Sequence, residues 1–127
     1  MSVPAGNLLA GLPSGSLPDE LFATLTDTAA SSGTVRIERI LSTGQASPDG
    51  FWYDQDWDEF VLVVLGGARL QIEGEAERAL GPGDWMMIPA RRRHRVAWTD
   101  PAAPTVWLAV HIGEQKPPQR MGQGEDA

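Results

Sequence analysis

The sequence contains no cysteine and no apolar run long enough to span a membrane. The first absence excludes disulfides and thiolate metal sites, which suits a reducing compartment. The second excludes a transmembrane helix, which needs roughly 18 apolar residues. The first fifteen residues, MSVPAGNLLAGLPSG, lack the basic segment and apolar core of a signal peptide. We therefore expect a cytoplasmic protein.

Positive charge is also scarce. The chain carries 10 Lys and Arg against 17 Asp and Glu, giving a net charge of -7 and a pI near 4.6. Such a field repels nucleic acid and anionic membranes, so neither is an expected partner. A phosphate-cradling glycine loop, a serine elbow and a cysteine nucleophile are all missing as well.

What remains is typical of one globular domain. The chain has 127 residues, of which 42% are hydrophobic and 21% charged, enough for a self-sufficient core. Residues 1–16 are rich in Gly, Pro and Ser and predict a flexible arm. The polar segment 113–127 predicts a disordered tail. Leucines spaced four apart, with acids in the first turn, predict a short helix and turn over residues 17–33.

From residue 34 to residue 112 the pattern indicates strands and turns only. TVRIERIL alternates, EFVLVVL is apolar on both faces, and Gly74 reads as a hairpin turn between ARLQIE and EAERAL. A second turn, GPGD, precedes WMMIP, and HRVAW and TVWLAVHI follow. Seven or more short strands at this spacing indicate a sandwich or barrel.

Two motifs within these strands resemble those of the cupin family. Glu59 is followed by six residues and then Gly66, as in the second half of the first cupin motif. Gly83, five residues, Pro89 and then His94 match the second motif, with Arg91 where the family prefers Gly. The resemblance covers residues 34–112. It implies an all-β fold, a double-stranded β-helix (jelly-roll barrel), preceded here by the short N-terminal helix.

The two histidines of the first cupin motif are missing. With three residues before Glu59 their positions hold Tyr53 and Gln55, and with four residues they hold Trp52 and Asp54. The resemblance implies a barrel centre for one divalent metal (Mn, Fe, Zn or Ni). Only Glu59 and His94 remain of its four ligands, with Gln55 as a candidate carbonyl donor. We therefore favour a metal-free pocket in which Glu59 and His94 are hydrogen-bonded, and keep a Gln55, Glu59 and His94 metal site as the alternative.

The second histidine, His111, lies in TVWLAVHI. The aliphatic set Val106, Leu108, Val110 and Ile112 is the better candidate for the core face, which would turn His111 away from the pocket. In the inverted assignment His111 would join Glu59 and His94 in a triad of two histidines and one carboxylate.

Other polar residues offer candidate ligand contacts. An arginine of ARRRHRV, best Arg91, could clamp a carboxylate or phosphate at the barrel mouth. In the alternative reading these arginines pair with the acids around Asp54 and Asp56. Tyr53 and Trp98 are further pocket candidates, although aromatic residues are more often plain core.

These residues lead to three functional hypotheses. The first is a small barrel that binds a small, anionic molecule through Tyr53, Gln55, Glu59, Arg91, His94 and Trp98. The second is a metal-dependent enzyme of the isomerase or dioxygenase type, and the third is a non-catalytic structural or interaction domain. Excess apolar surface on EFVLVVL also predicts a homodimer.

Overall fold

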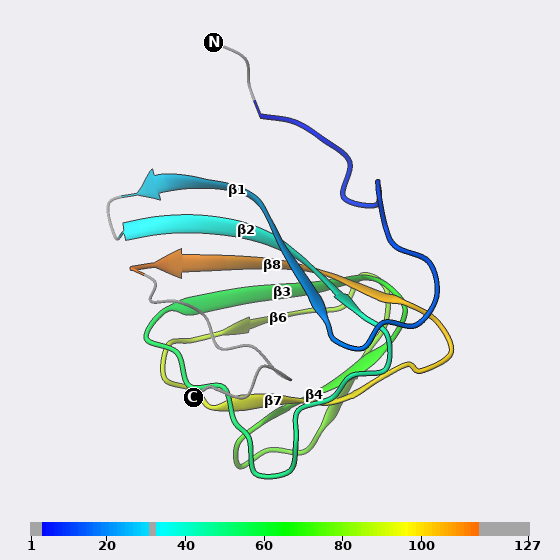
Figure 1. Ribbon diagram of the computed structural model, residues 1–127. Coiled ribbons are helices and arrows are strands. Elements are labelled where there is room, and N and C mark those ends of the chain that lie inside the picture. Colours follow the sequence, from blue (N-terminus) through cyan, green and yellow to red (C-terminus); the bar gives the residue numbers. More distant parts are fainter. Residues whose placement is uncertain (1–3, 31–32, 115–127) are drawn as a thin grey trace.

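In the computed structural model, all regular secondary structure of the described residues is β-strand (Figure 1). The structure describes residues 4–30 and 33–114, and within this part of the chain no helix is long and apolar enough to cross a membrane. The eight strands are β1 (Leu21–Ala30), β2 (Gly33–Ser42), β3 (Asp58–Leu65), β4 (Ala68–Ile72), β5 (Arg78–Leu80), β6 (Trp85–Ile88), β7 (His94–Thr99) and β8 (Thr105–Gly113).

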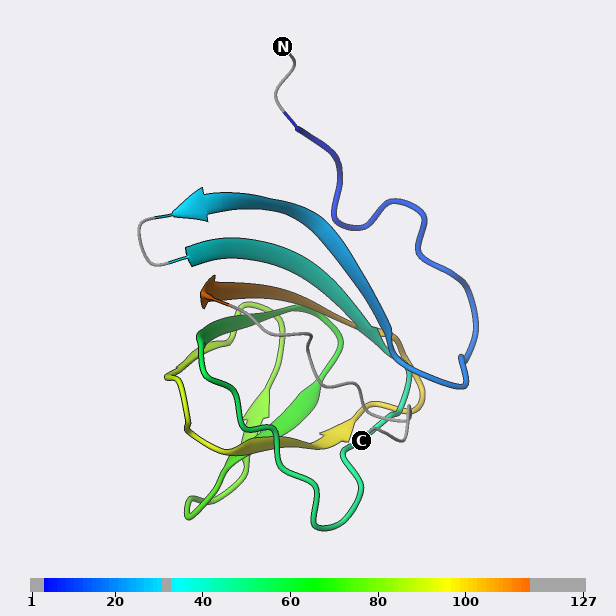
Figure 2. The same ribbon diagram turned by 60° about the vertical axis from the view of Figure 1, so that its left-hand side comes forward.

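The strands form two antiparallel sheets that face each other as in a jelly roll. The larger sheet has the order β1-β2-β8-β3-β6 and the smaller one β5-β4-β7. Figure 2 shows the curved larger sheet on one side and the smaller sheet closing the other. The irregular segment 43–57 lies along β7, to which it is joined by the bridge between Tyr53 and His94 and by the hydrogen bond from Ser47 N to the carbonyl oxygen of Val96. The strands expected over residues 34–112 are confirmed.

The helix predicted over residues 17–33 is wrong. Leu21–Ala30 form β1, which pairs with β2 along its whole length except for a bulge between Thr24 and Thr26. A spacing of four residues fits one helical turn, but it is also a multiple of the strand period of two. Leu21 and Leu25 therefore could not discriminate between the two structures. The expected turn at residues 31–32 and most of the expected tail fall outside the described residues.

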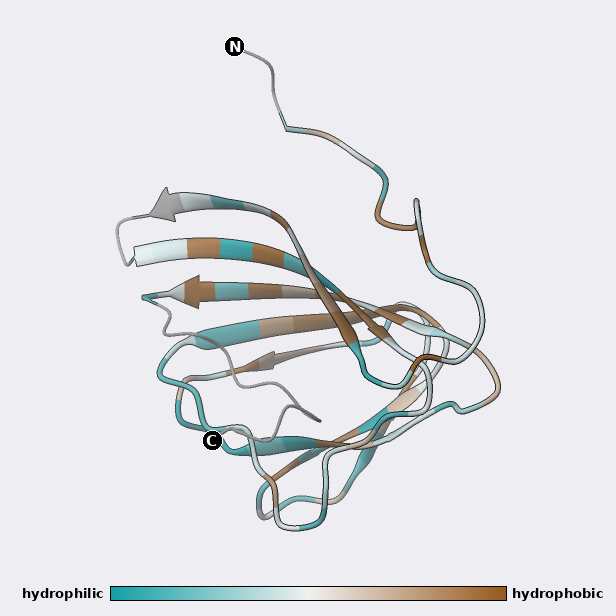
Figure 3. Ribbon diagram, viewed as in Figure 1, coloured by the Kyte–Doolittle hydropathy of each residue, from teal (hydrophilic) through white to brown (hydrophobic). Residues whose placement is uncertain are grey.

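The hydrophobic core occupies one end of the barrel. Its centre consists of Val63, Ala68, Leu80 and Trp107, each at most 7% exposed. Along β2 and β8, hydrophobic and hydrophilic residues alternate in bands (Figure 3), as expected when successive side chains point to opposite faces of a sheet. The polar bands of these strands belong to the other end of the barrel, where the site lies.

Candidate functional site

The acidic stretch before β3 alternates between buried and exposed residues. Asp54, Asp56 and Asp58 are exposed, whereas the odd-numbered residues between and beside them are buried. Those buried residues are Tyr53, Gln55, Trp57 and Glu59. Period two thus sends the aspartates to solvent and one tyrosine, one amide and one carboxylate into the barrel. Positions 53 and 55 are the inward pair, and Trp52 and Asp54 are not.

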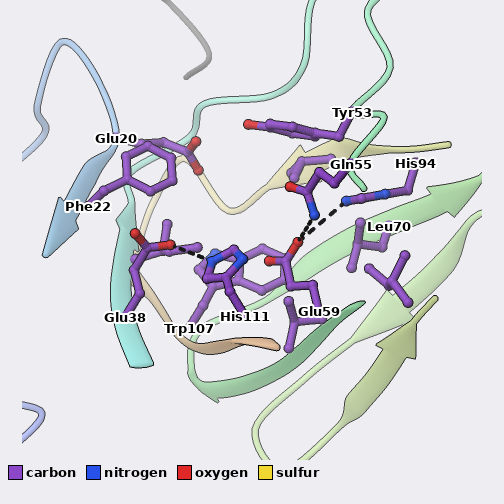
Figure 4. A pocket seen from close by; sticks show the side chains of 14 residues that line it. Glu20, Phe22, Glu38, Tyr53, Gln55, Glu59, Leu70, His94, Trp107 and His111 are labelled. Atoms are coloured by element: carbon purple, nitrogen blue, oxygen red, sulfur yellow. Dashed lines mark hydrogen bonds and ion pairs between the residues drawn. The ribbon is translucent and has the colours of Figure 1, made fainter. Parts of the chain in front are cut away.

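Glu59, Gln55 and His94 meet inside the barrel (Figure 4). The Gln55 Nε2 donates a hydrogen bond to Glu59 Oε1 over 3.0 Å. The His94 Nε2 lies 3.8 Å from the same carboxylate oxygen. All three residues are at most 8% exposed. Residues 35 positions apart in the sequence, on β3 and β7, therefore present a carboxylate and an imidazole to one small space.

A hydrogen bond to the backbone fixes the orientation of the His94 ring. Its Nδ1 lies 3.0 Å from the carbonyl oxygen of Arg92. Since a carbonyl can only accept, Nδ1 carries the proton, and in the neutral ring Nε2 keeps its lone pair. The Tyr53 ring stacks on the imidazole with centroids 5.4 Å apart. His94 therefore offers a free nitrogen to the cavity next to Glu59.

His111 lies in the pocket, contrary to the expected face assignment. Trp107, Ala109 and His111 point into the barrel, and the aliphatic residues of β8 point to the other face of the sheet. The Trp57 Nε1 donates to His111 Nδ1 over 2.8 Å. The His111 Nε2 then carries the proton and lies 3.0 Å from Glu38 Oε1. Both ring nitrogens are thus engaged, so His111 does not join Glu59 and His94 as a ligand.

Sequence reasoning missed a second wall of the pocket. Glu38 on β2 is 1% exposed and faces the interior, as does Phe22 on β1. Glu20 just before β1 accepts a hydrogen bond from Ser42 Oγ, which itself accepts one from Trp107 Nε1. In Figure 4 Glu20, Phe22 and Glu38 lie across the pocket from Gln55 and His94. The sequence pattern that could have revealed this wall is the alternation in TVRIERIL. The side chains in register with Glu38, and not those in register with Val35 and Ile37, face the barrel interior.

Together the two walls enclose a cavity with about 50 Å³ of free volume, room for a few water molecules or a small organic molecule. Its floor is apolar and shared with the core through Val61, Leu70, Ile88 and Trp107. Of the candidates drawn from the sequence, Tyr53, Gln55, Glu59 and His94 line the cavity.

Arg91 and Trp98 lie outside this lining. The Arg91 side chain is 67% exposed and its guanidinium pairs with Asp54 and Asp56, at 3.1 Å and 2.9 Å. This agrees, for Arg91, with the interpretation that the arginines pair with the acidic loop. Arg92 and Arg93 pair instead with Glu75 and Glu73. Trp98 is 36% exposed, with the Arg69 guanidinium 5.1 Å from its ring centroid.

The residues present do not fit the four-ligand metal centre that the resemblance implies. Among residues 4–30 and 33–114, no three His, Asp or Glu side chains gather closely enough to hold one ion. Gln55, Glu59 and His94 would supply one amide, one carboxylate and one imidazole, a weak set for zinc or iron. In addition, Gln55 turns its nitrogen, not its oxygen, toward Glu59.

Comparison with known proteins gives one family and several similar structures. The family model described as the cupin domain matches residues 40–111, more than half of the chain. A crystal structure from Ralstonia eutropha JMP134, of a protein named provisionally as a mannose-6-phosphate isomerase, is 54% identical. It covers 86% of this chain and 97% of its own, with a TM-score of 0.77.

Two more distant structures share the fold. A cupin superfamily protein from Desulfitobacterium hafniense DCB-2 is 17% identical over 90% of this chain and 95% of its own, with a TM-score of 0.65. The polyketide cyclase RemF from Streptomyces resistomycificus is 18% identical over 86% and 75%, with a TM-score of 0.62. No curated protein matches the chain.

Proposed function

The chain belongs to the cupin family, and from that premise we propose that its barrel binds a small organic molecule and transfers protons to and from it. Enzymes of the isomerase type need these two capacities. The observation that carries the proposal is the buried pair of Glu59 and His94, 3.8 Å apart at the edge of one cavity. Cupin barrels support many unrelated reactions, so the fold alone does not identify the function. We therefore base the proposal on this pair of residues.

The pair has the parts that acid–base chemistry requires. In the neutral ring the lone pair of His94 Nε2 can take a proton, and a protonated ring beside Glu59 would be stabilised by the carboxylate. Gln55 holds Glu59 Oε1 in place and Tyr53 covers the imidazole ring. We assign proton transfer to Glu59 and His94 and positioning to Gln55 and Tyr53.

The lining of the cavity bears on the ligand's charge. Glu20, Glu38 and Glu59 all line it, and no lysine or arginine does among the residues that the structure describes. An anionic ligand, expected from the sequence, would meet these three carboxylates. We therefore propose a ligand without negative charge. For the same reason the provisional name of the Ralstonia protein, whose substrate would carry a phosphate, is not transferred to this chain.

The two other hypotheses have less support. A metal-dependent isomerase or dioxygenase would need ligands beyond Gln55, Glu59 and His94, so we propose that the barrel works without a resident ion. A non-catalytic domain with its pocket packed shut would need tryptophans inside. Trp57 and Trp107 are buried, but Trp85 and Trp98 lie on the surface, 60% and 36% exposed, and a cavity remains beside Trp107.

The proposal is tested by proton exchange on a small carbonyl compound. Hydroxyacetone in D₂O exchanges its enolisable protons, and proton NMR follows the loss of their signals. Wild-type protein should accelerate this exchange, and Glu59→Gln and His94→Gln should each lose at least about tenfold of the acceleration, since a positioned acid or base contributes 10²–10⁴-fold. Both variants keep hydrogen-bonding groups of similar size.

Glu77→Gln is the matched control, because Glu77 is exposed on the connection between β4 and β5. It should exchange hydroxyacetone at the wild-type rate. If the two pocket variants exchanged as fast as wild type, Glu59 and His94 would not be the groups that transfer protons. Elemental analysis of protein purified without chelator should accompany the assay. One equivalent of a transition metal, lost in both variants, would favour the metal-dependent alternative.

A further inference from the structure

The hydrogen-bonding atoms around Glu59 and His94 indicate how the ligand is recognised. We propose that the cavity selects a neutral molecule that donates hydrogen bonds from a hydroxyl group, of the α-hydroxycarbonyl class. This inference rests on the proposed function, because it names the ligand of the same cavity. It depends on three atoms that act as acceptors: Gln55 Oε1, Glu59 Oε2 and His94 Nε2.

Gln55 presents its oxygen to the cavity because its nitrogen is used elsewhere. A carboxylate can only accept, so the 3.0 Å hydrogen bond to Glu59 Oε1 requires the Gln55 nitrogen as its donor. Figure 4 shows the Gln55 oxygen directed away from Glu59, toward the space between the two walls. No described residue donates a hydrogen bond to this oxygen, although Gln55 is only 8% exposed. Its donor must therefore come from the contents of the cavity.

Glu59 and His94 add two acceptors on the same wall. Glu59 Oε1 accepts from Gln55, whereas Oε2 receives no hydrogen bond from the part of the chain that the structure describes. The His94 ring carries its proton on Nδ1, toward the carbonyl oxygen of Arg92, so Nε2 is an acceptor too. Neither Glu59 Oε2 nor Gln55 Oε1 belongs to the unpartnered polar atoms that are sealed from solvent. A molecule in the cavity can therefore reach both.

The N–H donors on the facing side of the lining are directed to other protein groups. Trp107 Nε1 donates to Ser42 Oγ over 3.1 Å, and His111 Nε2 lies 3.0 Å from Glu38 Oε1. The hydroxyl of Tyr53, which also lines the cavity, can both donate and accept, so it does not discriminate between ligands. What the proton-transferring pair and its amide neighbour offer to a ligand is thus a set of acceptors.

The rest of the lining agrees with a small hydroxycarbonyl compound. The floor around Val61, Leu70 and Ile88 is aliphatic and can hold a methyl group. The free volume of about 50 Å³ restricts the ligand to a small molecule. A carbonyl group follows from the proposed function, since it acidifies the neighbouring protons that an acid–base pair transfers. A purely apolar ligand would displace water from the three acceptors and leave them unpaired, which is costly.

Hydroxyacetone and 2-butanone test the inference, because they have the same size and differ only in a hydroxyl replaced by a methyl group. Their affinities can be measured by NMR titration of the isotope-labelled protein. We expect hydroxyacetone to bind at least tenfold more tightly, since 2-butanone leaves the acceptors unpaired. Gln55→Met and Glu59→Gln should each reduce this preference at least threefold, because each removes an acceptor. Glu77→Gln should leave it unchanged.

The outcomes separate this inference from the proposed function. Equal affinities, or tighter binding of 2-butanone, would overturn hydroxyl recognition, while proton transfer would still be decided by the exchange assay. A preference unchanged in both pocket variants would also overturn the inference. Binding of neither compound would contradict both proposals. Thermal unfolding and retained binding of 2-butanone confirm that a variant keeps its cavity, and the comparison in wild-type protein decides the inference where a variant does not.

Discussion

At the scale of single residues, the site depends on strand alternation and on histidine tautomers. Alternation sends Gln55 and Glu59 inward and the aspartates between them outward. The hydrogen-bond partners then give the two histidines opposite roles. The carbonyl of Arg92 leaves Nε2 of His94 free, whereas Trp57 and Glu38 occupy both nitrogens of His111. Two identical residue types thus differ in chemistry because their neighbours differ.

Arg91 offers a prediction at this scale. It has φ of 68°, a left-handed conformation that glycine adopts without cost, and it occupies the position where the cupin motif prefers glycine. Arg91→Ala and Arg91→Gly both lose the ion pairs with Asp54 and Asp56, but only the glycine variant relieves the backbone. We expect Arg91→Gly to be more stable than Arg91→Ala by about 1 kcal/mol in urea unfolding. Equal stabilities would show that the backbone there is not strained.

At the scale of elements, the strands of residues 34–112 could be predicted, because short strands separated by Gly and Pro turns leave a clear pattern. The helix over residues 17–33 could not be excluded, since leucines four apart satisfy both periodicities. The inward face of β8 was missed for a different reason. This barrel places polar residues such as His111 inside, so the more apolar face of a strand does not identify the face that points inward.

The residues of the site, too, could be predicted only in part. Tyr53, Gln55, Glu59 and His94 were found through motif spacing, which reports positions along the chain. Glu20 and Glu38 belong to no motif of this kind. They reach the cavity only because β1 and β2 extend the larger sheet beyond β8, a pairing that the sequence does not display.

The turns joining strands allow a matched test. Gly66 and Gly74 both have positive φ, 84° and 88°. A Cβ at Gly66 would lie 2.6 Å from Thr105 Cα, whereas a Cβ at Gly74 would meet nothing within 4 Å. Gly74→Ala should therefore cost only the left-handed conformation, about 1–2 kcal/mol. Gly66→Ala should cost more than twice as much, because β8 must also move. Equal losses in chemical unfolding would contradict the close approach of β8 to this turn.

At the scale of the whole molecule, the apolar core and the cavity adjoin inside one barrel. The apolar cluster that includes Val63 and Trp107 supplies the floor of the cavity, and polar side chains such as Glu59 and His94 supply the rest of its lining. The outer face of the larger sheet carries exposed apolar side chains. It exposes Trp85 and Met87 on the edge strand β6, at 60% and 48%, next to Phe60, whose ring centroid is 5.6 Å from that of Trp85.

This outer face is where we expect the homodimer to form. Exposed large apolar side chains in a group mark association surfaces. Wild-type protein should have twice the monomer mass in light scattering at micromolar concentration, and Met87→Glu should reduce it to one monomer. Glu77→Gln, which leaves the apolar side chains of this face intact, should remain dimeric. A monomeric wild-type protein would show that the predicted homodimer does not form.

The central claim is that His94, and not His111, offers a free Nε2 to the cavity beside Glu59. The most direct measurement is long-range ¹H–¹⁵N NMR of the histidine rings at alkaline pH, where imidazole is neutral. With only two histidines in the chain, His94→Gln assigns both spectra. We expect the Nδ1–H tautomer for His94 and the Nε2–H tautomer for His111. An Nε2–H tautomer at His94 would show that its free nitrogen is Nδ1 and would contradict the proposed role of Nε2.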